Sequence, residues 1–293
     1  FKGILPPSSQ SEWNEYFALY KLIPQYKLIN SSITLNEFKF IFYWEYYHRL
    51  LGRFIGLFYL LPLLYFTFKN VIKTNYIKNF YLIFGIICFQ GFIGWYMVES
   101  GLTNLVSVSH YRLALHLVVA FLIISMIFWN YLNVKYKTEL TFFNNDRSDF
   151  LIKIYYGIIL IQVIFGAFVS GLDAGLIYQT WPLMNQSFFP DDISLLSNLN
   201  DRSLVQFLHR NLAYLILLYS LFLFWYFYKS NLFRYFKLTF YLLFIQVLLG
   251  ILTLISGLNS YLAILHQITS ILLLLSILNL NFRHIVQKKQ IFE

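Results

Sequence analysis

The stretch Glu45-Tyr46-Tyr47-His48-Arg49 opens one long apolar run, and Gln206-Phe207-Leu208-His209-Arg210 opens another. Two further runs of the same kind carry His116 and His266 close to their starts. A histidine inside a stretch that can cross a bilayer is costly, and it usually marks a functional site. The positions of these four histidines therefore guide the interpretation of the fold.

The composition is typical of a membrane protein. Of 293 residues, 59% are hydrophobic and 12% are charged, and the mean hydropathy is +0.61. Soluble domains carry roughly 25% charged residues, so we predict an all-α polytopic membrane protein. The single cysteine, Cys88, excludes an intramolecular disulfide framework. The net charge of +9 does not indicate nucleic-acid binding, because the basic residues are spread over loops.

Seven runs reach the roughly 20 residues that a membrane-spanning helix needs. They cover residues 47–68, 80–98, 113–132, 154–172, 207–228, 238–258 and 261–281. The chain is thereby divided into four predicted parts: an extramembrane segment at the outer face (1–46), an N-terminal half bundle (47–132), a C-terminal half bundle (154–281) and a tail (282–293).

Lysine and arginine predict the orientation. Seven alternating crossings place these thirteen at one face: Lys69, Lys73, Lys78, Lys135, Lys137, Arg147, Lys153, Lys229, Arg234, Lys237, Arg283, Lys288 and Lys289. The opposite loops hold only Arg112 and Arg202, with four lysines in the N-terminal segment. By the positive-inside rule the tail is cytoplasmic, or in the matrix of a mitochondrion. The four histidines then lie toward the outer face.

The chain also contains an internal repeat. In each half, the span with the histidine-arginine motif is followed by a span with Gln-x-x-x-Gly, at 90–94 and at 246–250. The next span carries the second histidine. A third Gln-x-x-x-Gly, at 162–166, precedes the second block and has no counterpart before the first. We therefore expect an eighth helix upstream of Phe1, which would complete two pseudo-symmetric four-helix bundles.

The repeat divides the histidines into two pairs, His48 with His116 and His209 with His266. Imidazoles from neighbouring helices at equal depth are standard axial ligands of heme iron. The pattern therefore predicts two heme sites, with each pair binding one iron. His110 and His284 have no such partner, and we interpret them as hydrogen-bonding residues at the membrane interface.

Arginines stand at the same ends of the helices as the histidines: Arg49, Arg53, Arg112 and Arg210. A guanidinium is well suited to pair with a heme propionate at a partly dry site. The alternative is that these arginines anchor the helices at the membrane interface. We interpret the Gln-x-x-x-Gly motifs as helix-packing elements, in which glycine permits close approach and glutamine bonds across helices.

One position distinguishes the two halves. Glu45 lies three residues before His48 and shares its helix face, whereas the matching residue before His209 is the neutral Gln206. A carboxylate in only one site indicates proton chemistry or charge stabilisation there, and the other site would hold a permanent cofactor. The alternative is that Glu45 merely pairs with Arg49, four residues on.

These motifs together resemble heme A synthase in its alphaproteobacterial and mitochondrial form. The resemblance rests on residues 37–53, 90–98, 111–116, 170–176, 206–210 and 266–267, and it extends over nearly the whole chain. It implies an eight-helix bundle whose first helix is absent here. It also implies the oxidation of a methyl group of heme O to a formyl group, which gives heme A for cytochrome oxidase.

The resemblance further implies a role for each histidine pair. His209 and His266, with Arg210, would bind a heme b cofactor. His48 and His116, with Arg49, Arg53, Arg112 and the catalytic Glu45, would hold the heme O substrate. The cysteine pair of Bacillus-type relatives is absent.

Heme O, membrane lipid, heme O synthase and an unidentified electron acceptor are the expected partners. The expected location is a bacterial cytoplasmic membrane or a mitochondrial inner membrane, and the wealth of Phe, Ile, Asn and Lys favours a bacterium. Ligand geometry alone also fits two other classes: a diheme cytochrome that exchanges electrons with quinone, and a heme transporter or chaperone.

Overall fold

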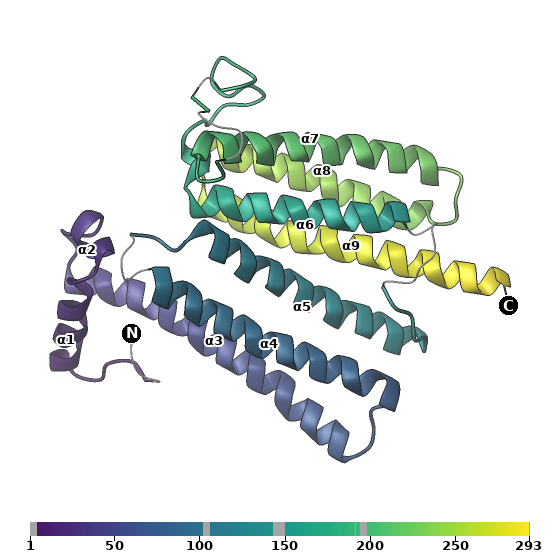
Figure 1. Ribbon diagram of the computed structural model, residues 1–293, viewed down its shortest axis with the longest axis horizontal. Coiled ribbons are helices and arrows are strands. Elements are labelled where there is room, and N and C mark those ends of the chain that lie inside the picture. Colours follow the sequence, from purple (N-terminus) through teal and green to yellow (C-terminus); the bar gives the residue numbers. More distant parts are fainter. Residues whose placement is uncertain (1–4, 102–105, 143–149, 191, 194–197, 293) are drawn as a thin grey trace. The chain divides into compact units, whose positions relative to one another are not determined.

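The computed structural model describes residues 5–101, 106–142, 150–190, 192–193 and 198–292, and within these ranges every regular element is a helix (Figure 1). Arg147 and the side chains of Lys288 and Lys289, which entered the prediction of orientation, lie outside the described part. The prediction of an all-α fold is confirmed.

Seven helices of the described part are long and apolar enough to cross a membrane. They are α3 (Leu35–Phe68), α4 (Thr74–Gly101), α5 (His110–Tyr136), α6 (Phe150–Gly171), α7 (Arg202–Phe227), α8 (Phe233–Ile255) and α9 (Ser260–Phe292). Each contains one of the seven predicted spans or overlaps it closely. The chain is therefore a polytopic membrane protein, as predicted.

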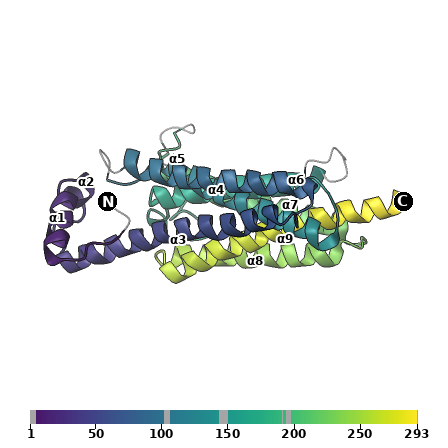
Figure 2. The same ribbon diagram turned by 90° about the horizontal axis from the view of Figure 1, so that it is seen from below.

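The chain forms two compact units, Phe1–Arg112 and Leu113–Glu293, and each is described here by itself. In the first unit α3 packs against α4. Two short helices, α1 (Gln10–Tyr20) and α2 (Pro24–Leu28), precede them. Helix α1 crosses the N-terminal end of α3, as two perpendicular views show (Figures 1 and 2).

Helix α3 begins well before the predicted start of its span at residue 47. Thr34 and Glu37 form a capping box: the Glu37 backbone N–H donates to the Thr34 hydroxyl (3.4 Å), and the Thr34 backbone N–H donates to the Glu37 carboxylate (2.7 Å). Trp13 of α1 packs edge-on against Phe42, with 5.0 Å between ring centroids. The cap and this aromatic contact stabilise helix in a stretch that the sequence placed in the extramembrane segment.

The 34 residues of α3 correspond to a helix about 50 Å long. The hydrocarbon core of a bilayer is only about 30 Å thick. The first turns of α3 therefore extend out of that core, and they are the turns on which α1 packs.

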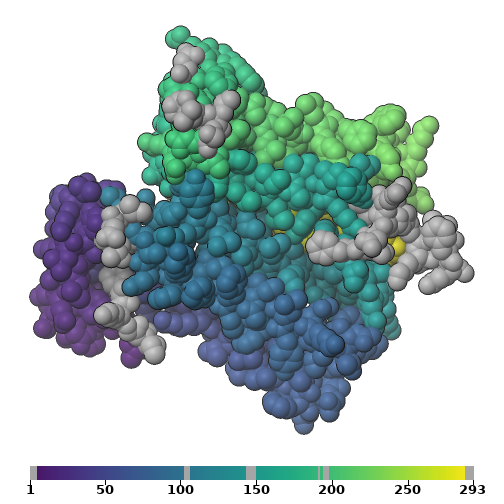
Figure 3. Space-filling view, in the orientation of Figure 1, coloured from purple at the N-terminus to yellow at the C-terminus, as the bar shows by residue number. Residues whose placement is uncertain are grey.

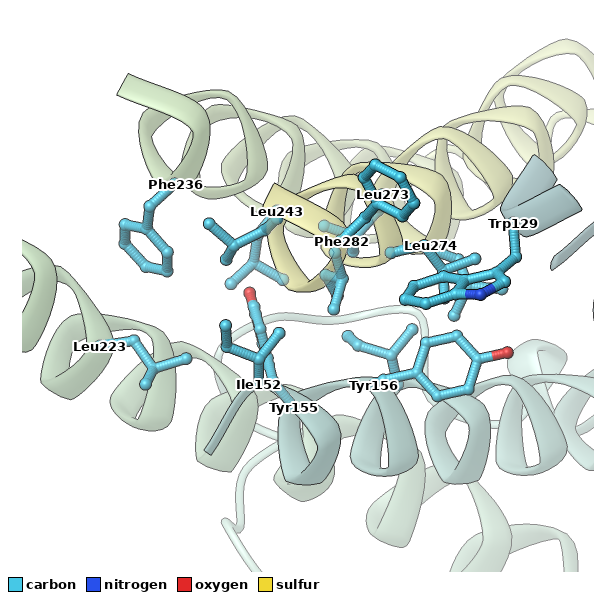
Figure 4. Close-up of a cluster of buried hydrophobic side chains, with 14 of the residues drawn as sticks. Trp129, Ile152, Tyr155, Tyr156, Leu223, Phe236, Leu243, Leu273, Leu274 and Phe282 are labelled. Atoms are coloured by element: carbon cyan, nitrogen blue, oxygen red, sulfur yellow. The ribbon is translucent and has the colours of Figure 1, made fainter. Parts of the chain in front are cut away.

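In the second unit α6 packs against α7 and α9, and α8 packs against α7 and α9. Their buried side chains, together with Trp129 of α5, form one core (Figure 4). Lipid offers no hydrophobic driving force between helices, so close packing and buried hydrogen bonds hold such a bundle together. The Tyr155 hydroxyl, for example, donates to Ser220 of α7 at 3.3 Å.

Helix α9 continues through most of the predicted tail. Phe282 is fully buried and Ile285 is 2% exposed. The Phe282 ring also packs edge-on against Trp129, with 5.4 Å between centroids. Because these side chains belong to the core, the helix is stabilised beyond residue 281, where the hydropathy of the span ends.

The segment between α6 and α7, residues 172–201, is called the outer loop from here on. It starts with the short helix η2 (Ala174–Leu176), and its described part gathers around the start of α7 (Figure 3). A methyl group at Gly175 would lie 2.9 Å from Leu258, in the turn between α8 and α9. Glycine at this position permits the loop to approach that turn.

Candidate functional site

Two histidine–glutamine pairs lie across neighbouring helices of the second unit. Gln162 of α6 donates from its side-chain amide to the His209 carbonyl at 3.0 Å, and the same nitrogen is 3.4 Å from the Nε2 atom of His209. Gln246 of α8 places its amide nitrogen 3.2 Å from the Nε2 atom of His266 on α9. Both Gln-x-x-x-Gly motifs of this unit therefore bond across helices, as predicted.

The glycine of each motif faces the same imidazole as the glutamine. An ideal Cβ on Gly166 would lie 3.2 Å from Cε1 of His209, and one on Gly250 would lie 3.0 Å from Cε1 of His266. Both distances are shorter than ordinary van der Waals contact, so no larger residue fits without movement of the ring. The predicted role of glycine in close approach is confirmed here, and the partner that approaches is a histidine ring.

The two imidazoles also differ in their hydrogen bonding. The Nδ1 atom of His266 lies 3.1 Å from the main-chain carbonyl of Gln246, to which it can donate. Among the described residues, the buried Nδ1 atom of His209 has no hydrogen-bond partner. The rings are close enough for their charges to interact.

Arg210, the residue after His209, binds the outer loop. One terminal nitrogen donates to the Tyr178 carbonyl at 2.8 Å, and the other donates to the carbonyls of Thr180 (2.9 Å) and Leu183 (3.4 Å). Its Nε atom is buried and has no hydrogen-bond partner within the described part of the chain. The Nε–H of this guanidinium is therefore available to a carboxylate.

These groups fit a heme. Two imidazoles would supply the two protein ligands of its iron, and the Nε–H of Arg210 would pair with a propionate. In the described ranges no cluster of three or more His, Cys, Asp or Glu side chains is suited to a bare metal ion. Heme needs no such cluster, because its porphyrin supplies the other four ligands.

Gln206 holds the same loop carbonyl as Arg210. Its side chain is 2% exposed, and its amide donates to the Tyr178 carbonyl at 2.9 Å. A carboxylate in this position would face that carbonyl with a second acceptor. The hydrogen bond to the Tyr178 carbonyl therefore explains why a neutral amide occupies position 206, which the sequence alone did not show.

A polar cluster joins the far part of the outer loop to α7. The Tyr178 hydroxyl donates to one Asp192 oxygen, and the Ser203 hydroxyl donates to the other at 2.7 Å. These two hydrogen bonds, that from Tyr178 first, lower the pKa of the Asp192 carboxyl. Burial and then the bond to Asp192 raise the pKa of the Tyr178 phenol.

Sequence reasoning missed this cluster and the role of Arg210 in the loop. The available signal was the spacing of Gln206 and Arg210, which are four residues apart at the start of a helix that follows a long loop. Asp191, the residue before Asp192, lies outside the described residues.

In the first unit Glu45 and Arg49 form an ion pair, with 3.3 Å between carboxylate and guanidinium. This is the pairing that would explain Glu45 without catalysis, so its catalytic role stays a prediction. His48 and Arg53 are exposed on the same helix. Helix α4 contributes Tyr96, whose ring lies under the Arg112 guanidinium at 4.9 Å.

His116 belongs to the second unit, whereas His48 belongs to the first. Their pairing around a substrate heme therefore stays a prediction, as does the division into half bundles at 47–132 and 154–281.

Comparison with known proteins decides the family. The family model described as cytochrome oxidase assembly protein (COX15-CtaA) matches residues 1–278. The chain belongs to this family. Among its relatives, the heme A synthase of Pelagibacter ubique (strain HTCC1062) is 48% identical over 282 residues, which cover 94% of this chain and 83% of the relative. The heme A synthases of Rickettsia felis and Rickettsia conorii are each 41% identical, over 93% of this chain and 83% of theirs.

Membership of the cytochrome oxidase assembly family agrees with the resemblance drawn from the motifs. The match extends from the N-terminal segment to α9 and so includes both histidine-arginine motifs. The family relationship and the seven apolar helices together make this an integral membrane protein with a role in heme A biosynthesis.

Proposed function

We propose that this chain is a heme A synthase that oxidises a methyl group of heme O to a formyl group. The observation that carries the proposal is the 48% identity to a heme A synthase over 94% of the chain. The two histidines of the second unit support it, because imidazole is a standard ligand of heme iron.

The C-terminal site is proposed to hold heme b as a permanent cofactor. His209 and His266 would be the axial ligands of its iron, and the Nε–H of Arg210 would bind a propionate. When bound, heme b would supply one-electron transfer. Gln206 and Arg210 would keep the outer loop against the turn of α7 that carries His209, which limits access of water from that side.

The N-terminal site is proposed to hold the substrate. His48 and His116 would bind the iron of heme O, and Arg49, Arg53 and Arg112 would bind its propionates. Glu45, on the helix face of His48, would accept protons as the methyl group is oxidised. With water as the source of oxygen, the change R–CH₃ + H₂O → R–CHO releases four protons and four electrons. The protons can pass to Glu45, and the electrons leave through an acceptor protein or quinone.

The positive-inside pattern supports a cytoplasmic C-terminus and heme sites toward the outer face. The organisms of the similar heme A synthases, Pelagibacter and Rickettsia, support a bacterial cytoplasmic membrane. Heme O synthase is the proposed donor of the substrate, since heme O is too hydrophobic to travel through water.

The test is a pigment analysis of a bacterium from which the heme A synthase gene has been deleted. Such cells should accumulate heme O and lack heme A, and expression of this protein should restore heme A. Heme O that persists beside a fully expressed, heme-loaded protein would overturn the proposal. That result would favour a diheme cytochrome or a heme carrier instead.

A further inference from the structure

The two Gln-x-x-x-Gly motifs of the second unit do more than bring helices together. In both, the glycine faces the Cε1 edge of a histidine ring on the following helix, and a Cβ added to it would lie 3.2 Å from that atom at Gly166 and 3.0 Å at Gly250. The glutamine one turn earlier lies opposite the Nε2 edge of the same ring, at 3.4 Å and 3.2 Å. Each ring is thus contacted along two edges by one helix.

Several other helical glycines face open space. A methyl group on Gly157, which lies on the same helix as Gly166, would meet nothing within 4 Å. The same holds for Gly52, Gly56, Gly85 and Gly91. Glycine inside a helix costs roughly 1 kcal/mol relative to alanine. At Gly166 and Gly250 the close ring contact gives a reason for that cost.

The rings of His266 and His209 differ in the number of contacts that restrain them. His266 has a third restraint, because its Nδ1 atom lies 3.1 Å from the Gln246 carbonyl. A proton on Nδ1 leaves the lone pair on Nε2, which faces the Gln246 amide at 3.2 Å and would bind a metal in place of that amide. His209 has no such bond at Nδ1 within the described residues. Its ring can therefore turn more easily than that of His266.

We propose that Gly166 and Gly250 are positioning residues that set the ring planes of His209 and His266 as axial ligands of heme. This inference rests on the proposed function of the C-terminal pair. Each glycine leaves space for an imidazole edge that any side chain would displace. The Gln246 carbonyl then fixes the tautomer of His266 and raises its strength as a ligand.

The proposal makes a graded prediction. In Gly250→Ala the added methyl pushes against a ring that is also bonded at Nδ1, so ring position and the bond to Gln246 cannot both be kept. We expect heme to dissociate about tenfold faster, in line with the loss of an outer-shell contact. The ferric low-spin electron paramagnetic resonance signal, which depends on the angle between the two imidazole planes, should shift as well. Gly166→Ala should shift the signal less.

Gly157→Ala is the matched control, because it makes the same change on α6 in open space. Alanine favours helix at all three positions, so the variants are expected to fold. The measurements are the resonance spectrum, the reduction potential and the rate of heme transfer to apomyoglobin, each on purified protein.

The order Gly250→Ala, then Gly166→Ala, with Gly157→Ala equal to the unaltered protein, would support the proposal. Unchanged spectra and dissociation rates in the first two variants would overturn it, while the proposed function would stand. If the unaltered protein contains no heme b, or if His209→Ala keeps its heme b, the heme assignment fails and the proposal fails with it.

Discussion

Glu45 and Gln206 occupy matching positions in the two halves and have different partners. Glu45 pairs with Arg49 on its own helix, at 3.3 Å. Gln206 instead bonds to the Tyr178 carbonyl, and Arg210, the counterpart of Arg49, binds that carbonyl as well. With an amide in place of the carboxylate, Arg210 has no ion pair with residue 206. Both Gln206 and Arg210 then donate hydrogen bonds to the outer loop. Gln206 thus helps to hold the loop, whereas the catalytic role of Glu45 stays a proposal.

The substitution Glu45→Gln gives the first half the residue that the second half already has. We expect heme A formation to fall about 100-fold or more, because a positioned proton acceptor contributes on the order of 10²–10⁴ in rate. Heme b content should be unchanged. Heme O and heme A are separated by chromatography of extracted pigments, with spectroscopy of heme b as the control. Normal heme A production by this variant would reduce Glu45 to a partner of Arg49.

At the scale of elements, the outer loop is held to α7 by a row of side chains on its first turns. Arg202 donates to the Asp173 carbonyl at 2.7 Å. Ser203 binds Asp192, and Gln206 and Arg210 bind loop carbonyls. These residues recur at helical spacing, so they share one face of α7. The loop is thereby placed beside the turn that carries His209.

Arg210→Ala should loosen the outer loop. Loss of one hydrogen bond from a charged group costs about 1.5–3 kcal/mol, so local opening should become at least about tenfold more frequent. Limited proteolysis within residues 172–190 measures this. Arg210→Lys keeps the charge but loses the forked geometry, and it should give an intermediate rate. Arg234→Ala, on α8 away from the loop, is the control. Equal protection in Arg210→Ala and the control would show that the loop does not depend on this side chain.

The loop should also respond to pH at two limits. Because the pKa of Asp192 is lowered, its carboxylate stabilises the loop at pH values above its pKa in the unfolded chain, about 3.9. This contribution is lost as the pH falls through the pKa of Asp192 in the folded protein. Because the pKa of Tyr178 is raised, its phenol stabilises the loop below about pH 10, its pKa in the unfolded chain. This contribution is lost as the pH rises through the pKa of Tyr178 in the folded protein. Protection from proteolysis should thus be constant between about pH 5 and 9. Asp192→Asn should remove the acid limit and move the basic limit to lower pH, because the bond to Asp192 helps to raise the Tyr178 pKa. An acid limit that persists in this variant would contradict the assignment.

The sequence predicted the helices well and the loop poorly, for a physical reason. Hydropathy over about 20 residues reports transfer into lipid, and this alone located all seven spans. The start of α3 was missed because Phe38 and Phe42 are helical through contacts with Trp13, far away in the chain. Arg210 was assigned to a propionate from its neighbour His209, whereas its loop partners lie about 30 residues earlier. Such long-range contacts leave no local pattern.

On the scale of the whole molecule, the outer surfaces of the helices are apolar. Phe54, Phe58 and Leu61 of α3 and Leu218 and Trp225 of α7 are all more than half exposed. Patches of this size would cause aggregation in water, but in a bilayer they face the acyl chains. The four candidate histidines lie toward the N-terminal ends of α3, α5, α7 and α9, opposite the ends that lead into the basic segments. This distribution agrees with a heme enzyme whose hydrophobic substrate reaches it through the membrane.

The central claim is that the two histidine pairs differ, with a cofactor heme at His209 and His266 and a substrate heme at His48 and His116. The most direct test is the heme composition of the purified protein and of its His209→Ala and His48→Ala variants, determined from pyridine hemochromes. The unaltered protein should contain heme b together with heme O or heme A. His209→Ala should lose heme b, whereas His48→Ala should keep heme b and lose the other pigment. Two molecules of heme b per protein, with equal losses from both substitutions, would contradict the account.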